Sequence, residues 1–274
     1  MRHLRRHLAP VPDEAWSAIE VEARRALKTY LSARRLIDFS GPHGFDHAAV
    51  NLGRARAFDF EHRLSAGPAV NARLREVTPL LELRVPFELP LRELEDMDRG
   101  ATDLDLGSVV EAARALAYAE DRAVFYGVKS PGYEGMVPGS PYSPVALSDD
   151  PQNLAPAVSS AIACLREAGV DGPYVLALDA ATYTAMLQTT GPGGYPVLQH
   201  VGRLLDGPAV WAPALDGALV VSMRGGDFEM VVGQDISVGY LEHGAESVSF
   251  YLEESLVFRL LGPEASVPMR RAHG

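Results

Sequence analysis

Strict alternation of apolar and polar positions marks one segment of the chain as a strand. In LELRVPFEL, residues 81–89, every odd position is Leu, Val or Phe, and the even positions are charged residues or proline. This pattern predicts a strand with one buried and one solvated face. Pro86 has no N–H to donate to a sheet, so we expect this strand at an edge or beside a bulge.

Apolar positions spaced three and four apart predict two long helices. The first spans about residues 13–34, and the second spans 109–126, where the apolar stripe is rich in alanine. Such small side chains let another element approach closely. Ser108 and Glu111 match a capping box at the start of the second helix, and Gly127 is a natural end.

The remaining elements predict a mixed protein in which helices and strands are segregated. Helices are expected at about 155–168 and 180–188, and a loop at 189–196. Strands are expected at 174–179, 209–215, 217–226, 228–243 and 247–262.

Residues 49–62 and 68–79 look extended and together predict a long hairpin-like arm. This segment contains RARAFDFEHR and has too few large apolar residues for a core of its own. We therefore expect the arm to be stabilised by a surface on which it lies.

Composition narrows the class of protein. The chain has 274 residues, 47% of them hydrophobic, and a formal net charge of −11, so it can bury a core and is repelled by nucleic acid. No run reaches about 18 apolar residues, so no membrane span is expected. The basic start leads into no apolar segment, so no secretory signal is expected. The single cysteine, Cys164, lies in an apolar helical stretch and predicts a buried thiol in a soluble protein of a reducing compartment.

The stretch GPHGFDH, residues 41–47, comes near a metal-binding motif. His43, Asp46 and His47 approximate the inverted zinc-protease pattern H-x-x-E-H, which would make the chain a metal hydrolase. Gly44 interrupts the helical turn that such a site needs, and Asp is a methylene shorter than Glu. Solvated loop histidines are the favoured interpretation, and no metal is expected.

The other motifs that could bind a metal or take part in catalysis are weak as well. The N-terminal His3 and His7 stand among arginines, which predicts a basic, mobile face rather than a cation site. No phosphate-binding loop or nucleophile elbow is present. Glu253 and Glu254 are neighbours on an expected strand, so they should face opposite sides. We therefore predict no catalytic residues and no enzymatic activity.

Several separated blocks, in a fixed order, resemble the encapsulin shell proteins of the linocin-like family 1. They are LAPVPDEAW, LSARRLIDFSGPHGF, LRVPFEL, RGATDLDLGSVVEAARALAYAED, AGVDGPYVLAL, RGGDFEMVVGQDISVGYLEH and YLEESLVFR. The resemblance runs from about residue 4 to 268. It implies an α+β fold like that of tailed-phage major capsid proteins.

The resemblance also implies a division of the chain. Residues 1–48 would form the N-terminal helix and elbow, and 49–78 the extension loop. Residues 79–131 and 225–274 would form a peripheral domain, and residues 132–224 an axial domain.

The function implied is a cytoplasmic, icosahedral shell of about 60 or more copies. Such a shell encloses a cargo enzyme, a peroxidase or a ferritin-like protein of iron storage or oxidative stress, held by its C-terminal targeting peptide. The alternative is a phage or prophage major capsid protein with the same fold. Neither nucleic acid nor membrane is an expected partner of the shell.

The resemblance also implies roles for individual residues. The positions that would bind the cargo peptide are Leu27, Leu31, Arg34, Leu36, Asp38, Phe39, Asp235, Ile236, Val238 and Tyr240. Those that would line a pore at the five-fold axis are Gln188, Thr189, Thr190, Gly191, Pro192, Gly193, Gly194 and Tyr195. Arg92 stands where flavin-binding members carry tryptophan, so no cofactor is expected.

Overall fold

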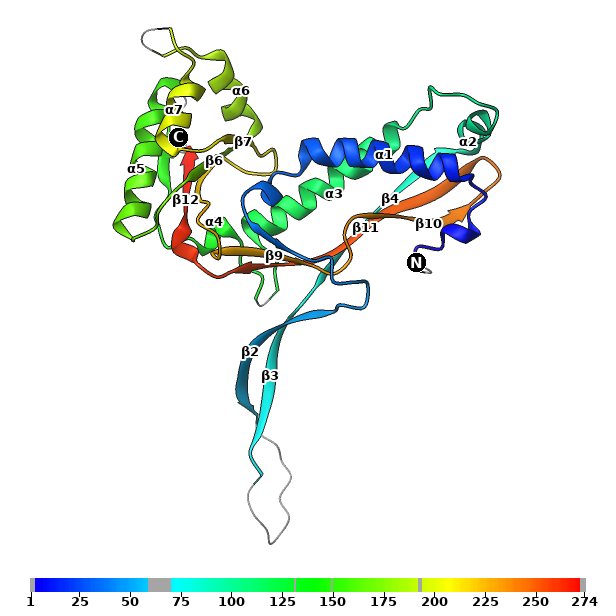
Figure 1. The fold of residues 1–274 in the computed structure, drawn as a ribbon, viewed down its shortest axis with the longest axis horizontal. Helices are drawn as coiled ribbons and strands as arrows, with labels where there is room; N and C mark the ends of the chain where they lie inside the picture. Colours follow the sequence, from blue (N-terminus) through cyan, green and yellow to red (C-terminus); the bar gives the residue numbers. More distant parts are fainter. Residues whose placement is uncertain (1–2, 59–69, 131, 149, 192–193, 272–274) are drawn as a thin grey trace.

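A computed structural model describes residues 3–58, 70–130, 132–148, 150–191 and 194–271 (Figure 1). The α-helices are α1 Asp13–Tyr30, α2 Leu91–Asp98, α3 Gly107–Tyr126, α4 Met136–Gly139, α5 Leu154–Glu167, α6 Ala180–Gln188 and α7 Val197–Leu205. Short 3-10 helices are η1 Arg6–Leu8, η2 Ala33–Arg35, η3 Pro151–Asn153 and η4 Pro263–Ala265. The strands are β1 Asp38–Ser40, β2 Ala49–Phe58, β3 Ala72–Pro79, β4 Leu81–Pro90, β5 Val145–Leu147, β6 Tyr174–Leu178, β7 Ala209–Trp211, β8 Ala218–Ser222, β9 Phe228–Val232, β10 Ser237–His243, β11 Ser247–Leu260 and β12 Ser266–Arg271.

Three parts are visible in Figure 1, and we call them the body, the lobe and the arm. The body is the sheet of β1, β4, β9, β10 and β11 together with α1, α2 and α3. The lobe is the sheet β5-β12-β8-β6-β7 with α5, α6 and α7, and the arm is the hairpin β2-β3. Helices and strands are thus both present and segregated, as the sequence predicts.

The body is built on the long strand β11. It pairs antiparallel with β4 along one side, and with β10 and then β9 along the other. Among the described strands, β11 is the only neighbour of β4, so Pro86 lies on an edge strand as predicted. Phe87 and Leu89 of β4 are buried while Glu88 is exposed, which confirms the alternation.

Helices α1 and α3 are stacked on the body sheet, and their apolar stripes form its core. Trp16 of α1 meets Phe250 of β11 edge to face, with ring centroids 5.3 Å apart. Ala113 and Ala117 of α3 are fully buried, so the small residues allow the close packing that their pattern predicts. Burying each large apolar side chain contributes about 1.5–3 kcal/mol.

The lobe contains a segment that the sequence-based division places elsewhere. Strand β12 pairs with β8 and β5, so residues 266–271 complete the lobe sheet although the range 225–274 was expected in the peripheral part. The chain crosses from the body to the lobe through η4. Cys164 of α5 is half-buried and packs against the lobe core rather than being fully enclosed.

The arm projects away from the rest of the chain (Figure 1). Its strands pair only with each other among the described strands, and Leu52, Phe58, Leu74 and Val77 are all exposed. Residues 59–62, 68 and 69 of the expected extended runs lie outside the described residues. The lack of a core of its own agrees with the expectation from composition.

Three local predictions are wrong. The first helix ends at Tyr30 instead of Arg34, and a 3-10 turn follows it. The second begins at Gly107 without a capping box, because the hydroxyl of Ser108 donates to the carbonyl of Glu88 at 2.7 Å. The described N-terminal residues are not a mobile face, since Leu4 is buried and its carbonyl accepts from the N–H of Tyr240 at 2.9 Å.

Candidate functional site

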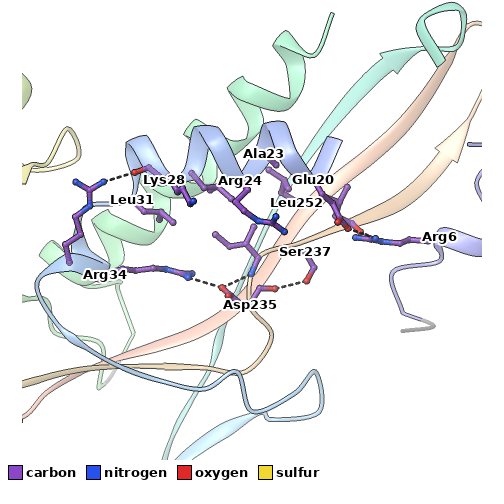
Figure 2. Close-up of a pocket in the computed structure, with 14 residues that line it drawn as sticks. Arg6, Glu20, Ala23, Arg24, Lys28, Leu31, Arg34, Asp235, Ser237 and Leu252 are labelled. Atoms are coloured by element: carbon purple, nitrogen blue, oxygen red, sulfur yellow. Dashed lines mark hydrogen bonds and ion pairs between the residues drawn. The ribbon is translucent and has the colours of Figure 1, made fainter. Parts of the chain in front are cut away.

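A groove of about 470 Å³ runs along one side of α1 (Figure 2). The opposite wall is the turn 235–237 with the start of β10, and Leu252 of β11 lies between them. The N-terminal segment partly covers the outer edge of β10, since the Nε of Arg6 donates to the carbonyl of Val238 at 2.8 Å. The groove is therefore bounded by a helix and by the edge of a sheet.

The middle of the groove is apolar. Ala23, Leu27 and Leu31 line it from α1 and its C-terminal cap, and they are spaced four residues apart, so they share one face of the helix. Ile236 and Val238 line it from the sheet side. Such a strip favours the aliphatic side chains of a bound segment.

Ion pairs stand at the two ends of the groove. At one end Arg6 pairs with Glu20 at 2.6 Å. At the other the Nη1 of Arg34 donates to the Oδ1 of Asp235 at 2.9 Å, and the same oxygen accepts from the N–H of Ile236. These pairs give the groove polar ends that can contact the backbone of a peptide.

Arg34 is also the partly buried outer member of a charge cluster. Its guanidinium donates to Glu120 through Nε and Nη2, at 2.7–3.0 Å, and to Glu254 at 3.0 Å. Both carboxyl groups are fully buried. Burial lowers the pKa of Arg34, but its bonds and attraction to the three carboxylates outweigh this and raise that pKa above its ordinary value.

A third buried carboxylate, that of Asp121, fixes the end of α1. Asp121 accepts hydrogen bonds from the N–H groups of Ser32 and Ala33, at 3.0 and 2.9 Å, and from the Ser32 hydroxyl. These are the free donors at the start of η2, so Asp121 on α3 caps it from a distance. Burial raises the pKa of Asp121 to about 7 despite these donors.

Six of the ten residues expected to bind a cargo peptide line this groove. They are Leu27, Leu31, Arg34, Asp235, Ile236 and Val238.

The other four lie outside the groove lining. Leu36 is buried in the lobe-side core, and Tyr240 is also buried. Asp38 accepts from the N–H of Gly226 at 2.6 Å, so its carboxylate closes the turn before β9. Phe39 is half exposed and its ring lies 5.3 Å from the guanidinium carbon of Arg34.

Several lining residues were missed by the sequence analysis. They are Arg6, Glu20, Ala23, Arg24, Lys28, Arg35, Ser237 and Leu252. Ala23 could have been predicted from the sequence, because it precedes Leu27 and Leu31 at the same helical spacing. Arg6 could not have been predicted, because its position depends on a contact between residues 232 apart in the chain.

The expected pore residues lie between α6 and α7, in the lobe. Gln188 ends α6, Thr190 bridges to Pro196, and the N–H of Gly191 donates to the carbonyl of Tyr195 at 2.8 Å. Tyr195 is exposed. Pro192 and Gly193 lie outside the described residues.

His43 and His47 do come together, with ring centroids 5.0 Å apart. Within the described part of the chain, however, no group of three or more His, Cys, Asp or Glu side chains is arranged to hold a metal ion. The His43 ring nitrogen is instead 3.1 Å from the Ser40 hydroxyl. No helix among the described residues is both long and apolar enough to span a bilayer.

Structures with the same fold belong to particles. A virus-like particle from Pyrococcus furiosus is 18% identical, with a TM-score of 0.66 over 93% of this chain and 98% of that chain. The capsid of an empty GTA particle is 14% identical, with a TM-score of 0.53 over 89% and 90% of the two chains. These likenesses confirm the expected capsid-like α+β fold.

Sequence comparison gives the family. The model of the protein family described as "encapsulating protein for peroxidase" matches residues 1–257. The type 1 encapsulin shell protein of Rhodospirillum rubrum is 51% identical over 98% of this chain and 97% of its own, and that of Mycobacterium tuberculosis is 42% identical over 98% and 99%. A shell protein is a structural component, in line with the prediction of no enzymatic activity. The chain belongs to the encapsulin shell protein family.

Proposed function

We propose that this chain assembles into a closed, cytoplasmic shell of about 60 or more copies that takes up a cargo enzyme. The groove between α1 and β10 carries the proposal. It is an elongated surface with an apolar middle and polar ends, and it matches six of the positions that the family resemblance implies for cargo binding. A C-terminal tail of the cargo would lie in it with aliphatic side chains against the apolar strip.

The cargo class is proposed from the family description, which names a peroxidase. A ferritin-like protein of iron or oxidative-stress chemistry is the other cargo that fits the resemblance. The loop from Gln188 to Tyr195 would line the opening through which small solutes pass. It carries no charged side chain, so the opening would select weakly by charge.

The test is co-expression of the chain with a fluorescent protein fused to the C-terminal tail of a peroxidase from the same organism. Leu31→Glu and Ile236→Glu place a charge in the apolar strip at positions that are only partly buried. Each should lower the reporter retained in purified particles about tenfold or more, because burying an unpaired charge costs well over 1.4 kcal/mol.

The control is Val21→Glu, which adds the same charge to α1 at an exposed position outside the groove. Particles should form in all three variants, and Val21→Glu should retain the reporter as the unaltered chain does. Equal retention by the groove variants would place the cargo site elsewhere.

A further inference from the structure

Two buried carboxyl groups lie side by side behind one polar end of the groove. They belong to Glu120 of α3 and Glu254 of β11, and both are completely shielded from solvent. The Nη2 of Arg34 donates to an oxygen of each, at 2.7 Å to Glu120 and at 3.0 Å to Glu254. The two groups are also within hydrogen-bonding reach of each other. We call them the carboxyl pair.

The charges around the carboxyl pair balance only if the pair carries a single negative charge. Among the described side chains, Arg34 is the only cation bonded to either group. The other charged neighbours, Asp121 beside the pair on α3 and Asp235 in the turn before β10, are acidic. Arg84 is paired with Glu253, whose side chain points to the opposite face of β11, so it does not supply the missing charge.

The hydrogen bonds of Glu254 lead to the same conclusion. Its Oε2 accepts from Arg34, but its Oε1 is buried and has no donor among the described residues. An ionised Glu254 would therefore hold an anionic oxygen out of water without a hydrogen bond, which is costly. A proton makes the group neutral and lets it donate to Glu120. Burial and then the charge of Glu120 raise the pKa of Glu254 well above its ordinary value.

We propose that Glu120 and Glu254 share one proton, and that the carboxyl pair in this state positions Arg34 at the groove. The Nε and Nη2 of Arg34 face the pair, and its Nη1 is left to hold Asp235. Glu254 is thus a positioning residue for the groove. This role rests on the proposed function, whereas the shared proton does not.

Infrared spectroscopy of the purified chain, without cargo and in whatever assembly state it adopts, tests for the proton. A protonated carboxyl group has a carbonyl band that carboxylates lack and that shifts in D₂O. At pH 8.5 the exposed carboxylates are ionised, and so is most of Asp121, whose pKa is raised only to about 7. The unaltered chain should therefore show a band from about one protonated carboxyl group per chain.

Two variants show whether that proton is shared. Glu254→Gln and Glu120→Gln each keep the size of the side chain and leave one carboxyl group beside Arg34. Each variant should lose the band, because the single remaining carboxylate is balanced by Arg34 and stays ionised. Glu229→Gln is the control and should keep the band, since that carboxylate pairs with Arg259 at 2.5 Å in another part of the sheet.

Two infrared results would overturn the shared proton. The first is the absence of the band from the unaltered chain. The second is a band that persists in Glu120→Gln, because Glu254 would then be protonated through burial alone. If one of the two variants does not fold, the unaltered chain and the other variant decide.

Retention of the tail-fused reporter tests the positioning role. The amide of Glu254→Gln can accept from Arg34 and donate to Glu120 as the protonated carboxyl does, so this variant should retain the reporter normally. Glu254→Leu can do neither and should retain severalfold less, with its melting temperature measured to show that it is folded. Equal retention by Glu254→Leu would overturn the positioning role. No retention by the unaltered chain would instead contradict the proposed function, and the infrared result would stand.

Discussion

At the scale of single residues, buried charges join segments that are far apart in the chain. Arg34 follows α1 and reaches Glu120 of α3 and Glu254 of β11. Asp121 holds Ser32 and Ala33 at the end of α1. The end of the helix that lines the groove is therefore fixed by ionisable groups, and its stability should depend on pH.

The sign of that dependence follows from the raised pKa of Asp121. The ordinary value is 3.8 and the folded value is about 7, so the folded chain binds this proton more tightly than the unfolded chain. Its contribution to stability is fully present below about pH 4 and is lost as pH rises through 7. Glu254, whose pKa is also raised, acts in the same direction.

Asp121→Asn should therefore flatten the fall of apparent melting temperature between pH 4 and pH 8. The slopes of apparent melting temperature against pH are compared, because asparagine lacks one of the two accepting oxygens of Asp121 and so changes stability at every pH. Asp103→Asn removes an exposed carboxylate and should keep the original slope. A variant slope equal to that of the unaltered chain would mean that Asp121 titrates normally.

Gly41 is the residue of the elbow most sensitive to substitution. Its φ is +124°, and an added Cβ would lie 2.4 Å from the carbonyl oxygen of Val232. Gly41→Ala should lower the free energy of unfolding by more than about 1 kcal/mol and reduce the yield of particles. Gly53→Ala is the matched control, because its φ is also positive but no atom lies within 4 Å, so its cost should be smaller.

The histidines beside Gly41 should matter much less. The double variant His43→Ala, His47→Ala should assemble normally in electron micrographs, since these side chains fill a loop and no metal-binding group surrounds them among the described residues. Failure of that variant to form particles would assign the histidines a structural role.

At the scale of elements, long periodic segments were predictable, and some short ones were not. The helix α3 and strand β4 follow directly from spacing and alternation, because each buries one continuous face. The eight-residue α2 and the six-residue β12 carry too short a pattern to identify. Pro268 also argues against a strand in sequence terms, because proline has no N–H to donate. Residues 266–271 form a strand because β8 and β5 lie beside them.

The candidate site was predictable only in part, for the same physical reason. Its helix side follows a regular stripe through Leu27 and Leu31. Its other wall depends on which face of the turn at 235–237 meets α1, and its end at Arg6 depends on a long-range contact. Tyr240 belongs to the same quoted block as Ile236 but is buried away from the groove lining.

The arm is the element whose exposed surface most needs a neighbour. Leu74 and Val77 of β3 are 45% and 52% exposed, and the arm projects from the body (Figure 1). Leu74→Ser with Val77→Ser should leave the circular dichroism of the single chain unchanged and reduce assembly severalfold, measured by size-exclusion chromatography. This result is expected if these side chains pack on another copy in the shell.

Val21→Ser is the comparison, since Val21 is equally exposed but lies on α1. It should assemble like the unaltered chain. If the arm variant assembles just as well, the exposed apolar residues of β3 are not a contact between copies.

At the scale of the whole molecule, the features to which we assign separate roles lie on separate parts. The body carries the groove proposed for cargo, the arm carries the exposed Leu74 and Val77, and the lobe carries the exposed Tyr195 (Figure 1). The groove, the arm and the loop lie on different parts of the chain. Substitutions in one should therefore leave the other two functions measurable.

Electron microscopy of particles purified from co-expression with the tail-fused reporter tests the central claim most directly. The account predicts closed, hollow particles of uniform diameter with reporter density inside, and reporter that elutes with the particles. A small oligomer without particles, or intact shells from which the reporter is absent, would contradict it.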